Sequence, residues 1–490
     1  MILRILRSTH WLKDFPKLRI SCIFQLQHKM AGTQAGSDNN TKDSPEESNN
    51  IFCFELKGGP FYFTVQNASE IGSKRQKFHY PQELQNCKEV LGMSSFAVST
   101  DGKNTTNGLH SIKSSVVHNM IRHYSMRDRL KTMENNSSFL MDKRCTVIPT
   151  LTLDKNVEGD DRFCRGFAIL VNEKGFPEDS VKDAVKEGIA EFDCLSFNRF
   201  VNEGDQIVHH PDTGVDNEET SSVVVPVPRP HIHPAFLDRE TIGVFHSYER
   251  SVRILNECKH LPEVQESLRI AAEHIEKDFS IQDYQQQMKH PFIVLEGLDA
   301  TGKSTLVEKL GQTLNSVVMR TPPDCVRHLR EKFDAHPEIL RRAYYSLGNY
   351  IVAKQIAEEC QTRAVVMDRF WQSTAAYAIA HESGCGDKSV LPPNEHWVYA
   401  WPEDLIKPSA ILFLTVNEDI RDERLTERNM TKLTHEEQLM RSKKSEFRER
   451  LLEAYVRMRD PAPIIIDASK SKVEVAEEAM EALRRRKLLP

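Results

Sequence analysis

One segment restricts the fold of this chain more than any other. It reads HPFIVLEGLDATGKSTLVEKL over residues 290–310. A short apolar run over 292–295 predicts a strand, and the apolar spacing after it predicts an amphipathic helix. Between the two, Gly297 and Gly302 bracket four residues and are followed by a lysine and a serine, which is the full phosphate-loop pattern G-x-x-x-x-G-K-[ST]. The segment therefore predicts a nucleotide-binding α/β domain.

The residue types in this loop have a physical reason. Glycines allow positive φ angles and a close backbone approach, so that successive N–H groups and a helix N-terminus surround phosphates. Lys303 can then reach the β and γ phosphates, and the Ser304 hydroxyl can ligate Mg²⁺. An ordinary glycine turn is the alternative, but a chance match to the full pattern is rare. The residues expected to bind ATP with Mg²⁺ are Gly297, Leu298, Asp299, Ala300, Thr301, Gly302, Lys303, Ser304 and Thr305.

A second strand-like run ends in an acidic residue. It reads AVVMDRF over 364–370, where Asp368 is followed by Arg369. In phosphate-loop proteins such a strand lies beside the first, so that Asp368 reaches Mg²⁺ or its waters and Arg369 faces the phosphates. Alone, the motif fits a strand end with a solvated Asp-Arg pair. Together with the loop it predicts Ser304 and Asp368 as the metal ligands.

Basic residues at helical spacing follow the strand expected over 410–415. Arg421, Arg424 and Arg428 would share one helix face. The charged stretch that follows, residues 429–450, is typical of a mobile lid whose arginines reach the phosphates on closure. The alternative is a solvated helix with i,i+4 charge pairs, so we expect only one or two of these arginines to act.

The C-terminal domain, expected over 291–490, should contain five parallel strands flanked by helices. The expected strands are 292–295, 317–320, 364–368, 410–415 and 463–466.

Several motifs resemble one family of phosphate-loop kinases. The domain has no guanine-specifying N/T-K-x-D motif, and arginine follows Asp368 where motor ATPases usually have glutamate. LEGLDATGKST at 295–305 together with DRFWQS at 368–373 resembles the thymidylate kinase family. RRAYYSLGNYIVA at 341–353 and WPEDL at 401–405 resemble its UMP- and CMP-phosphorylating branch.

The resemblance implies that ATP, with Mg²⁺, donates its γ-phosphoryl group to CMP, UMP, dCMP or dUMP, with a preference for dTMP as an alternative. The catalytic residues that it implies are Lys303, Asp299, Arg369, Arg424 and Arg428. The acceptor-binding residues that it implies are Arg330, Asn349, Arg369, Ser373 and Tyr377. Some family members carry a basic residue where this chain has Ala300, which would pass that role to Arg424 and Arg428. The segment 466–469 resembles the family's adenine-side loop.

The first fifty residues predict no globular structure. Residues 1–30 are basic and contain one acid, Asp14, which is typical of a mitochondrial transit peptide. A start at Met30 would instead leave a cytoplasmic form. Residues 31–50 are polar and predict a disordered linker.

Two further parts precede the kinase domain. Residues 51–234 contain strand-like runs and a helical pattern, which predict a mixed α+β domain of unknown function. Its end, 202–234, is rich in Pro, Asp, Glu and Ser and predicts an exposed loop. Apolar residues at helical spacing then predict a helical connector over 235–290.

Composition excludes some classes of function. The net charge is −6, from 65 Lys and Arg against 71 Asp and Glu, so no global charge attracts nucleic acid. No apolar run has the 18 residues of a transmembrane helix, and ten cysteines without a C-x-x-C pair predict reduced thiols. Four histidines, His209, His210, His231 and His233, lack partners at metal-site spacing and predict a solvated segment.

Other questions stay open at this level. A homodimer and a protein partner of the N-terminal domain are both compatible with the sequence. The alternative function is a nucleotide-sensing protein whose N-terminal half carries the main activity.

Overall fold

The computed structural model describes residues 50–56, 59–67, 78–81, 95–99, 116–135, 145–154, 163–171, 196–203, 205–210, 222–237, 239–240, 242–275, 281–384, 386–427 and 445–489. The predicted transit peptide lies outside these residues. So does the predicted linker, except for Asn50, which begins the first strand. Residues 48–490 form one unit.

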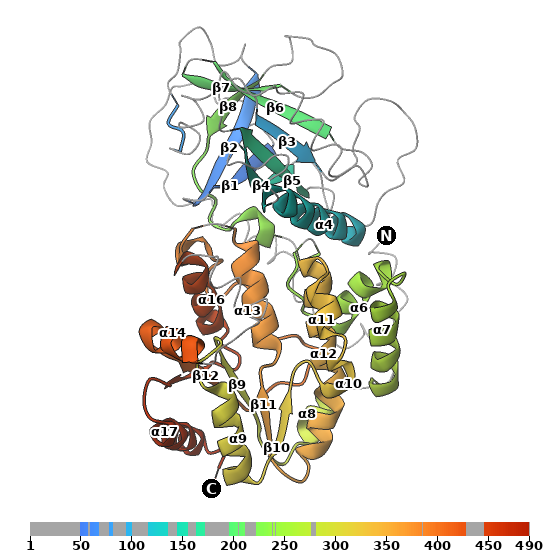
Figure 1. The fold of residues 1–490 in the computed structure, drawn as a ribbon, viewed down its shortest axis with the longest axis vertical. Helices are drawn as coiled ribbons and strands as arrows, with labels where there is room; N and C mark the ends of the chain where they lie inside the picture. The colour runs from blue at the N-terminus through green and yellow to red at the C-terminus, as the bar shows by residue number, and fades with distance from the viewer. Residues whose placement is uncertain are drawn as a thin grey trace, which may run out of the picture. The chain divides into compact units, whose positions relative to one another are not determined.

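In the N-terminal half, eight described strands form a closed antiparallel barrel in the order β1-β2-β8-β7-β6-β3-β5-β4 (Figure 1). The barrel closes because β1 pairs with both β2 and β4, which gives every strand two neighbours. A helix, α4 (Val116–Asn135), packs against β4 and β5. The strands are β1 (Asn50–Leu56), β2 (Gly59–Asn67), β3 (Ser95–Ser99), β4 (Cys145–Asp154), β5 (Phe163–Val171), β6 (Ser196–Glu203), β7 (Gln206–His210) and β8 (Ser222–Pro226).

The loop predicted over 202–234 is wrong in part, because β7 and β8 lie there. Tyr80 joins the two strands: its hydroxyl donates to the Val224 carbonyl at 2.9 Å and accepts from the Ile207 amide at 3.2 Å. Each strand has only five residues. Short apolar runs of this length are easily hidden among turn-forming residues in the sequence.

The sequence predicts that the histidines of this region are solvated, and this prediction is wrong in part. His209 and His233 are buried, whereas His231 is exposed. The Nδ1 atom of His233 accepts a hydrogen bond from the Ala235 amide at 3.2 Å, which caps the short helix η3 (Pro234–Phe236). Burial lowers the pKa of His233 to about 3, so the ring is neutral and can accept this bond.

The range predicted as a helical connector contains α6 (Tyr248–Glu257), α7 (Pro262–His274) and α8 (Ile281–Gln287). Apolar residues of α6 and α7 share a core with the long helix α12 (Glu338–Glu359). Ser251 of α6 also donates to the Ser346 hydroxyl of α12 at 2.7 Å. These helices therefore pack on the C-terminal domain instead of only linking to it.

A five-stranded parallel sheet lies at the centre of the C-terminal half, in the order β10-β11-β9-β12-β13. This confirms the predicted fold class, and the strands agree with the expected ones apart from their ends. They are β9 (Phe292–Gly297), β10 (Val317–Arg320), β11 (Val365–Asp368), β12 (Ala410–Thr415) and β13 (Ile464–Asp467).

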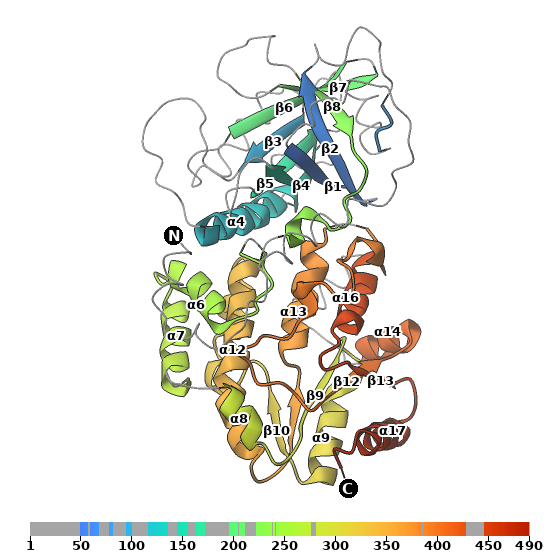
Figure 2. The same cartoon turned by 180° about the vertical axis from the view of Figure 1, so that it is seen from behind.

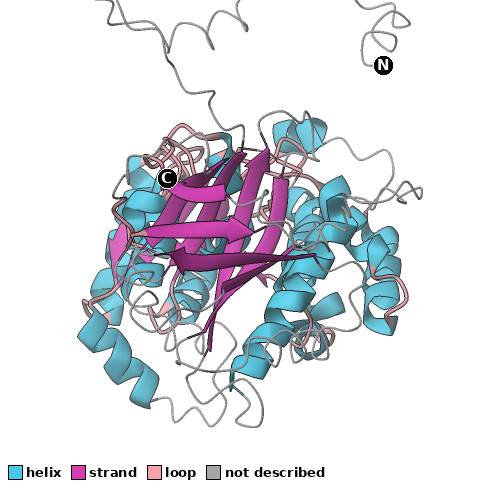
Figure 3. Cartoon of the chain, turned by 90° about the horizontal axis from the view of Figure 1, so that it is seen from above, coloured by secondary structure: helices cyan, strands magenta, loops and turns pink. Residues whose placement is uncertain are grey.

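Alternate residues of β9 enter two different cores. Ile293 and Leu295 pack with α9 (Lys303–Leu314) and α17 (Lys472–Arg485). Phe292 and Val294 pack with α12, α13 (Trp371–Glu382) and α16 (Ser445–Arg457) on the other face. Helices thus cover both faces of the sheet (Figures 2 and 3). All six residues of β9 are buried, as expected for the middle strand of a parallel sheet.

Shorter elements complete the C-terminal half: α10 (Asp324–Arg327), α11 (Arg330–Asp334), η4 (Lys388–Val390), η5 (Trp397–Tyr399) and α14 (Glu418–Glu427). Among the described residues, no helix combines the length and apolar character needed to cross a membrane.

Two valines of the sheet allow a matched test of this core. Val294 is fully buried in β9, whereas Val318 on the edge strand β10 is 48% exposed. We expect Val294→Ala to lower the free energy of unfolding by about 2–3 kcal/mol, because two buried methyl groups are lost and a cavity remains. Val318→Ala should change it by about 0.5 kcal/mol or less. Urea denaturation followed by tryptophan fluorescence measures both, and equal losses would contradict the assigned burial.

Candidate active site

The phosphate loop between β9 and α9 is shaped by glycines at both ends. Gly297 has a φ of +140° and Gly302 a φ of +91°, both in the region that favours glycine. A Cβ atom on Gly297 would lie 2.5 Å from the carbonyl oxygen of Leu414 in β12. Any other residue at 297 would therefore push the loop away from the sheet.

Lys303 begins α9 and points back into the loop. Its Nζ atom donates to the Leu298 carbonyl at 2.6 Å, and the Thr301 hydroxyl donates to the same oxygen at 2.8 Å. Burial, followed by the like charge of Arg369, lowers the pKa of Lys303 to about 8. A phosphate in the loop would supply the negative charge that favours the protonated form.

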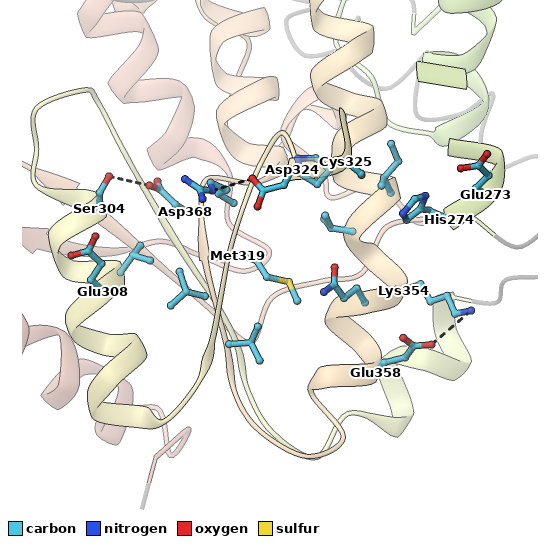
Figure 4. A pocket seen from close by; sticks show the side chains of 18 residues that line it. Glu273, His274, Ser304, Glu308, Met319, Asp324, Cys325, Lys354, Glu358 and Asp368 are labelled. Atoms are coloured by element: carbon cyan, nitrogen blue, oxygen red, sulfur yellow. Dashed lines mark hydrogen bonds and ion pairs between the residues drawn. The ribbon is translucent and has the colours of Figure 1, made fainter. Parts of the chain in front are cut away.

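Ser304 and Asp368 face each other across the sheet edge (Figure 4). The Ser304 hydroxyl donates to Asp368 Oδ2 at 3.2 Å, and both residues line an open groove of about 780 Å³. Hydroxyl and carboxylate oxygens are ligands that Mg²⁺ accepts, usually alongside water and phosphate oxygens. This pair therefore fits the metal that the sequence predicts.

Arg369 is held in an unusual backbone conformation. Its φ is +64°, a region that costs a non-glycine residue free energy. Its amide donates to the Leu295 carbonyl at 3.0 Å, and its own carbonyl accepts from the Thr321 hydroxyl at 2.9 Å. Its guanidinium then donates to Asp299 Oδ1 at 2.5 Å and to the Ser373 hydroxyl at 3.0 Å.

The Asp299–Arg369 ion pair joins the phosphate loop to β11. Burial alone would raise the pKa of Asp299, but the charges of Arg369 and Lys303 outweigh it and hold the pKa below its usual value. Asp299 is therefore ionised and keeps the Arg369 guanidinium in place.

Glu296 supports this arrangement and was not predicted from the sequence. It is fully buried, and its carboxylate accepts from the Phe370 amide at 2.9 Å and from the Ser373 hydroxyl at 2.5 Å. The Ser373 hydroxyl also lies 2.9 Å from the Tyr455 hydroxyl of α16. Burial raises the pKa of Glu296. A glutamate inside an otherwise apolar strand was the available signal in the sequence, because a buried carboxyl group needs hydrogen-bond partners.

A cavity of about 290 Å³ lies beside the Asp299–Arg369 pair, and six arginines against three carboxylates give it a positive lining; we call it the arginine-lined cavity. Four of the five predicted acceptor-binding residues line it: Arg330, Arg369, Ser373 and Tyr377. Asn349 is fully buried behind the wall, where it donates to the Thr374 hydroxyl at 3.5 Å. The other lining residues are Asp299, Arg320, Thr321, Pro322, Arg327, Glu338, Arg341, Arg342, Tyr345, Asp368, Phe370, Thr374 and His381.

The predicted lid arginines are not brought to this site in the described residues. Arg424 donates to the Ala468 carbonyl at 2.9 Å and lines neither the groove nor the cavity. Arg428 and most of the predicted lid lie outside the described residues. The roles of both arginines therefore stay predictions.

Comparison with known proteins agrees with this geometry. The profile of the thymidylate kinase family matches residues 295–479. Human mitochondrial UMP-CMP kinase 2 is 40% identical over 262 residues, which cover 53% of this chain and 56% of the human protein. The chain thus spans just over half the length of that relative.

More distant relatives match the same half of the chain. A probable thymidylate kinase of Saccharolobus solfataricus is 23% identical over 201 residues, covering 39% of this chain and 96% of that protein. Among solved structures, the thymidylate kinase of Candida albicans matches with a TM-score of 0.32 and 20% identity, over 41% of this chain and 93% of that one. Together with the phosphate loop and the Asp-Arg strand end, these matches show that residues 295–479 are similar to the thymidylate kinase family.

Proposed function

We propose that this chain is an ATP-dependent nucleoside monophosphate kinase. The observation that carries the proposal is the shared border of two anion sites. The phosphate loop and the arginine-lined cavity meet at the Asp299–Arg369 pair, and Asp368 lines both the groove and the cavity. A donor triphosphate in the loop and an acceptor phosphate in the cavity would therefore meet at Arg369.

The reaction needs positioning and charge neutralisation more than covalent chemistry. An acceptor phosphate has a second pKa of about 6, so near pH 7 it attacks the γ-phosphorus as a dianion without a general base. The new P–O bond forms as the bond to ADP breaks, and Lys303 and Arg369 oppose the charge on the transferred group. Mg²⁺ held by Ser304 and Asp368 would neutralise further phosphate charge when bound.

The acceptor is proposed to be a pyrimidine monophosphate: CMP, UMP, dCMP or dUMP. This follows the printed name of the human relative, while the thymidylate kinases among the relatives favour dTMP as the second candidate. We place this activity in residues 291–490, with 51–234 as an N-terminal domain of unknown function and 235–290 as the helical segment between them.

We also propose that the protein is mitochondrial. The support is the basic, acid-poor segment over residues 1–30, together with the mitochondrial name of the human relative.

Turnover with a panel of acceptors tests the activity. We expect the full chain to transfer phosphate from Mg-ATP to CMP, UMP, dCMP or dUMP faster than to dTMP or AMP. Lys303→Ala should lower kcat about 10²–10³-fold, because the positive charge that stabilises the negative charge on the transferred phosphoryl group is lost. Lys309→Ala, at an exposed position on the same helix, is the matched control and should be near normal. If the folded protein phosphorylates none of these acceptors, the proposal is rejected. If dTMP is the best acceptor, the proposed substrate class is corrected.

The lowered pKa of Lys303 predicts a pH dependence of ATP binding. ATP needs the charged ammonium, so its affinity should be full below about pH 8 and fall up to about tenfold per pH unit above it. Binding at pH 9 should then take up close to one proton, and binding at pH 7 almost none. Calorimetry in two buffers of different ionisation enthalpy measures this uptake. Lys303→Arg, which stays charged, should abolish the difference; the same uptake in that variant would assign it to another group.

Microscopy of a C-terminal fluorescent fusion tests the location. The full chain should overlap with a mitochondrial marker, and the same fusion started at Met30 should be diffuse, because the basic segment is missing. Identical diffuse signals from both would reject import.

A further inference from the structure

Two residues of the arginine-lined cavity are held by buried ion pairs. Glu338 and Arg342 lie one turn apart on α12, and Arg342 Nε donates to Glu338 Oε1 at 3.1 Å. Both side chains are more than nine-tenths buried. His381 of α13 lies 3.2 Å from the same carboxylate oxygen. Because water barely reaches these charges, their orientation depends on protein partners.

One partner comes from α4, in the N-terminal half of the chain. Arg127 Nη2 lies 2.5 Å from Glu338 Oε2, the oxygen that Arg342 leaves free. Burial alone would raise the pKa of Glu338, but Arg342, His381 and Arg127 together hold it well below its usual value. Helix α4 packs directly on α12, which brings Arg127 to this position (Figure 2).

Tyr124, one turn before Arg127 on the same helix, reaches the other end of Arg342. Its hydroxyl donates to Glu382 and lies 3.3 Å from Arg342 Nη1. The Tyr124 ring is buried, with the Arg342 guanidinium 5.5 Å and the Arg127 guanidinium 4.6 Å from its centre. The aromatic ring therefore lies against both arginines and limits how they can move.

Glu382, the last residue of α13, closes the network. Its Oε1 accepts from Arg342 Nη1 at 2.6 Å, and its Oε2 lies 3.2 Å from Arg165 Nη2 of strand β5. Burial would raise the pKa of Glu382, but Arg165 and Arg342 outweigh it, so the carboxylate stays ionised. The barrel and its helix thus supply partners to both carboxylates that orient Arg342.

We propose that the N-terminal barrel completes the acceptor side of the kinase site. Tyr124, Arg127 and Arg165 are its positioning residues: they do not line the cavity, but they hold Glu338 and Arg342 in its wall. This inference rests on the proposed kinase function. The phosphate loop is built by β9 and α9 and is not part of the network, so loss of these contacts should weaken acceptor binding and spare ATP binding.

Steady-state kinetics of the full chain test the proposal, with CMP or the best acceptor of the panel. Arg127→Gln removes the charge that faces Glu338 and should raise the acceptor KM about tenfold, while the ATP KM changes less than about twofold. Arg127→Lys restores the charge without the guanidinium fork and should recover part of the loss. Tyr124→Phe keeps the buried ring and loses only the hydroxyl; it should shift the acceptor KM in the same direction and serves if Arg127→Gln does not fold.

Arg229→Gln is the matched control. Arg229 follows β8 and donates to the Ser389 hydroxyl at 3.2 Å, so it also joins the two halves of the chain, but it does not line the cavity. Its variant should leave both KM values unchanged.

The outcomes separate the two proposals. No turnover in the wild type rejects the kinase function itself. If the wild type is active but Arg127→Gln or Tyr124→Phe leaves the acceptor KM unchanged, the positioning role is rejected. It is also rejected if these variants lower kcat and the melting temperature while both KM values stay unchanged.

Discussion

The phosphate loop depends on one close backbone approach between neighbouring strands. Gly297 of β9 pairs with Leu414 of β12, and a Cβ atom at 297 would lie 2.5 Å from the Leu414 carbonyl oxygen. No side chain fits there, and the φ of Gly297 is +140°, which also favours glycine. The chain therefore turns directly from β9 into the loop that ends at Lys303. Because β9 is also the middle strand, the same sheet edge carries Asp368 of β11. One steric constraint thus places Lys303 and the Asp368 carboxylate at the same edge of the sheet.

Charge then organises the rest of the site. Arg369 is partly buried, and an unpaired charge there would be unfavourable. Asp299 compensates this charge and is itself kept ionised by it. The same positive charge contributes to the low pKa of Lys303. The protonation states of Asp299 and Lys303 therefore depend on the neighbouring charges, and bound phosphates would compensate the excess of positive charge. The network around Glu338 and Glu382 extends to α4 and β5, so the arginine-lined cavity is not held by residues of the C-terminal half alone.

The sequence predicted the parallel sheet and the loop correctly, because both follow from short-range patterns. It also named Arg330, Ser373 and Tyr377, which do line one cavity. It did not identify Glu338, Arg341 or Arg342, although the last two stand in a quoted motif. Helix α12 is buried along most of its length, so its apolar spacing does not show which face meets a cavity. Strands β7 and β8 were missed because five-residue strands give little periodicity.

By itself, the sequence determined the features that depend only on residues close together in the chain. Glycine spacing and the lysine and serine after it need only local backbone geometry to form a phosphate loop. Tertiary structure alone decided which distant charges meet. Tyr124 and Glu382 are 258 residues apart, and Arg127 and Glu338 are 211 apart, yet each pair is in contact. Such pairs form only when two folded surfaces pack and exclude water, and no pattern along one segment specifies that surface.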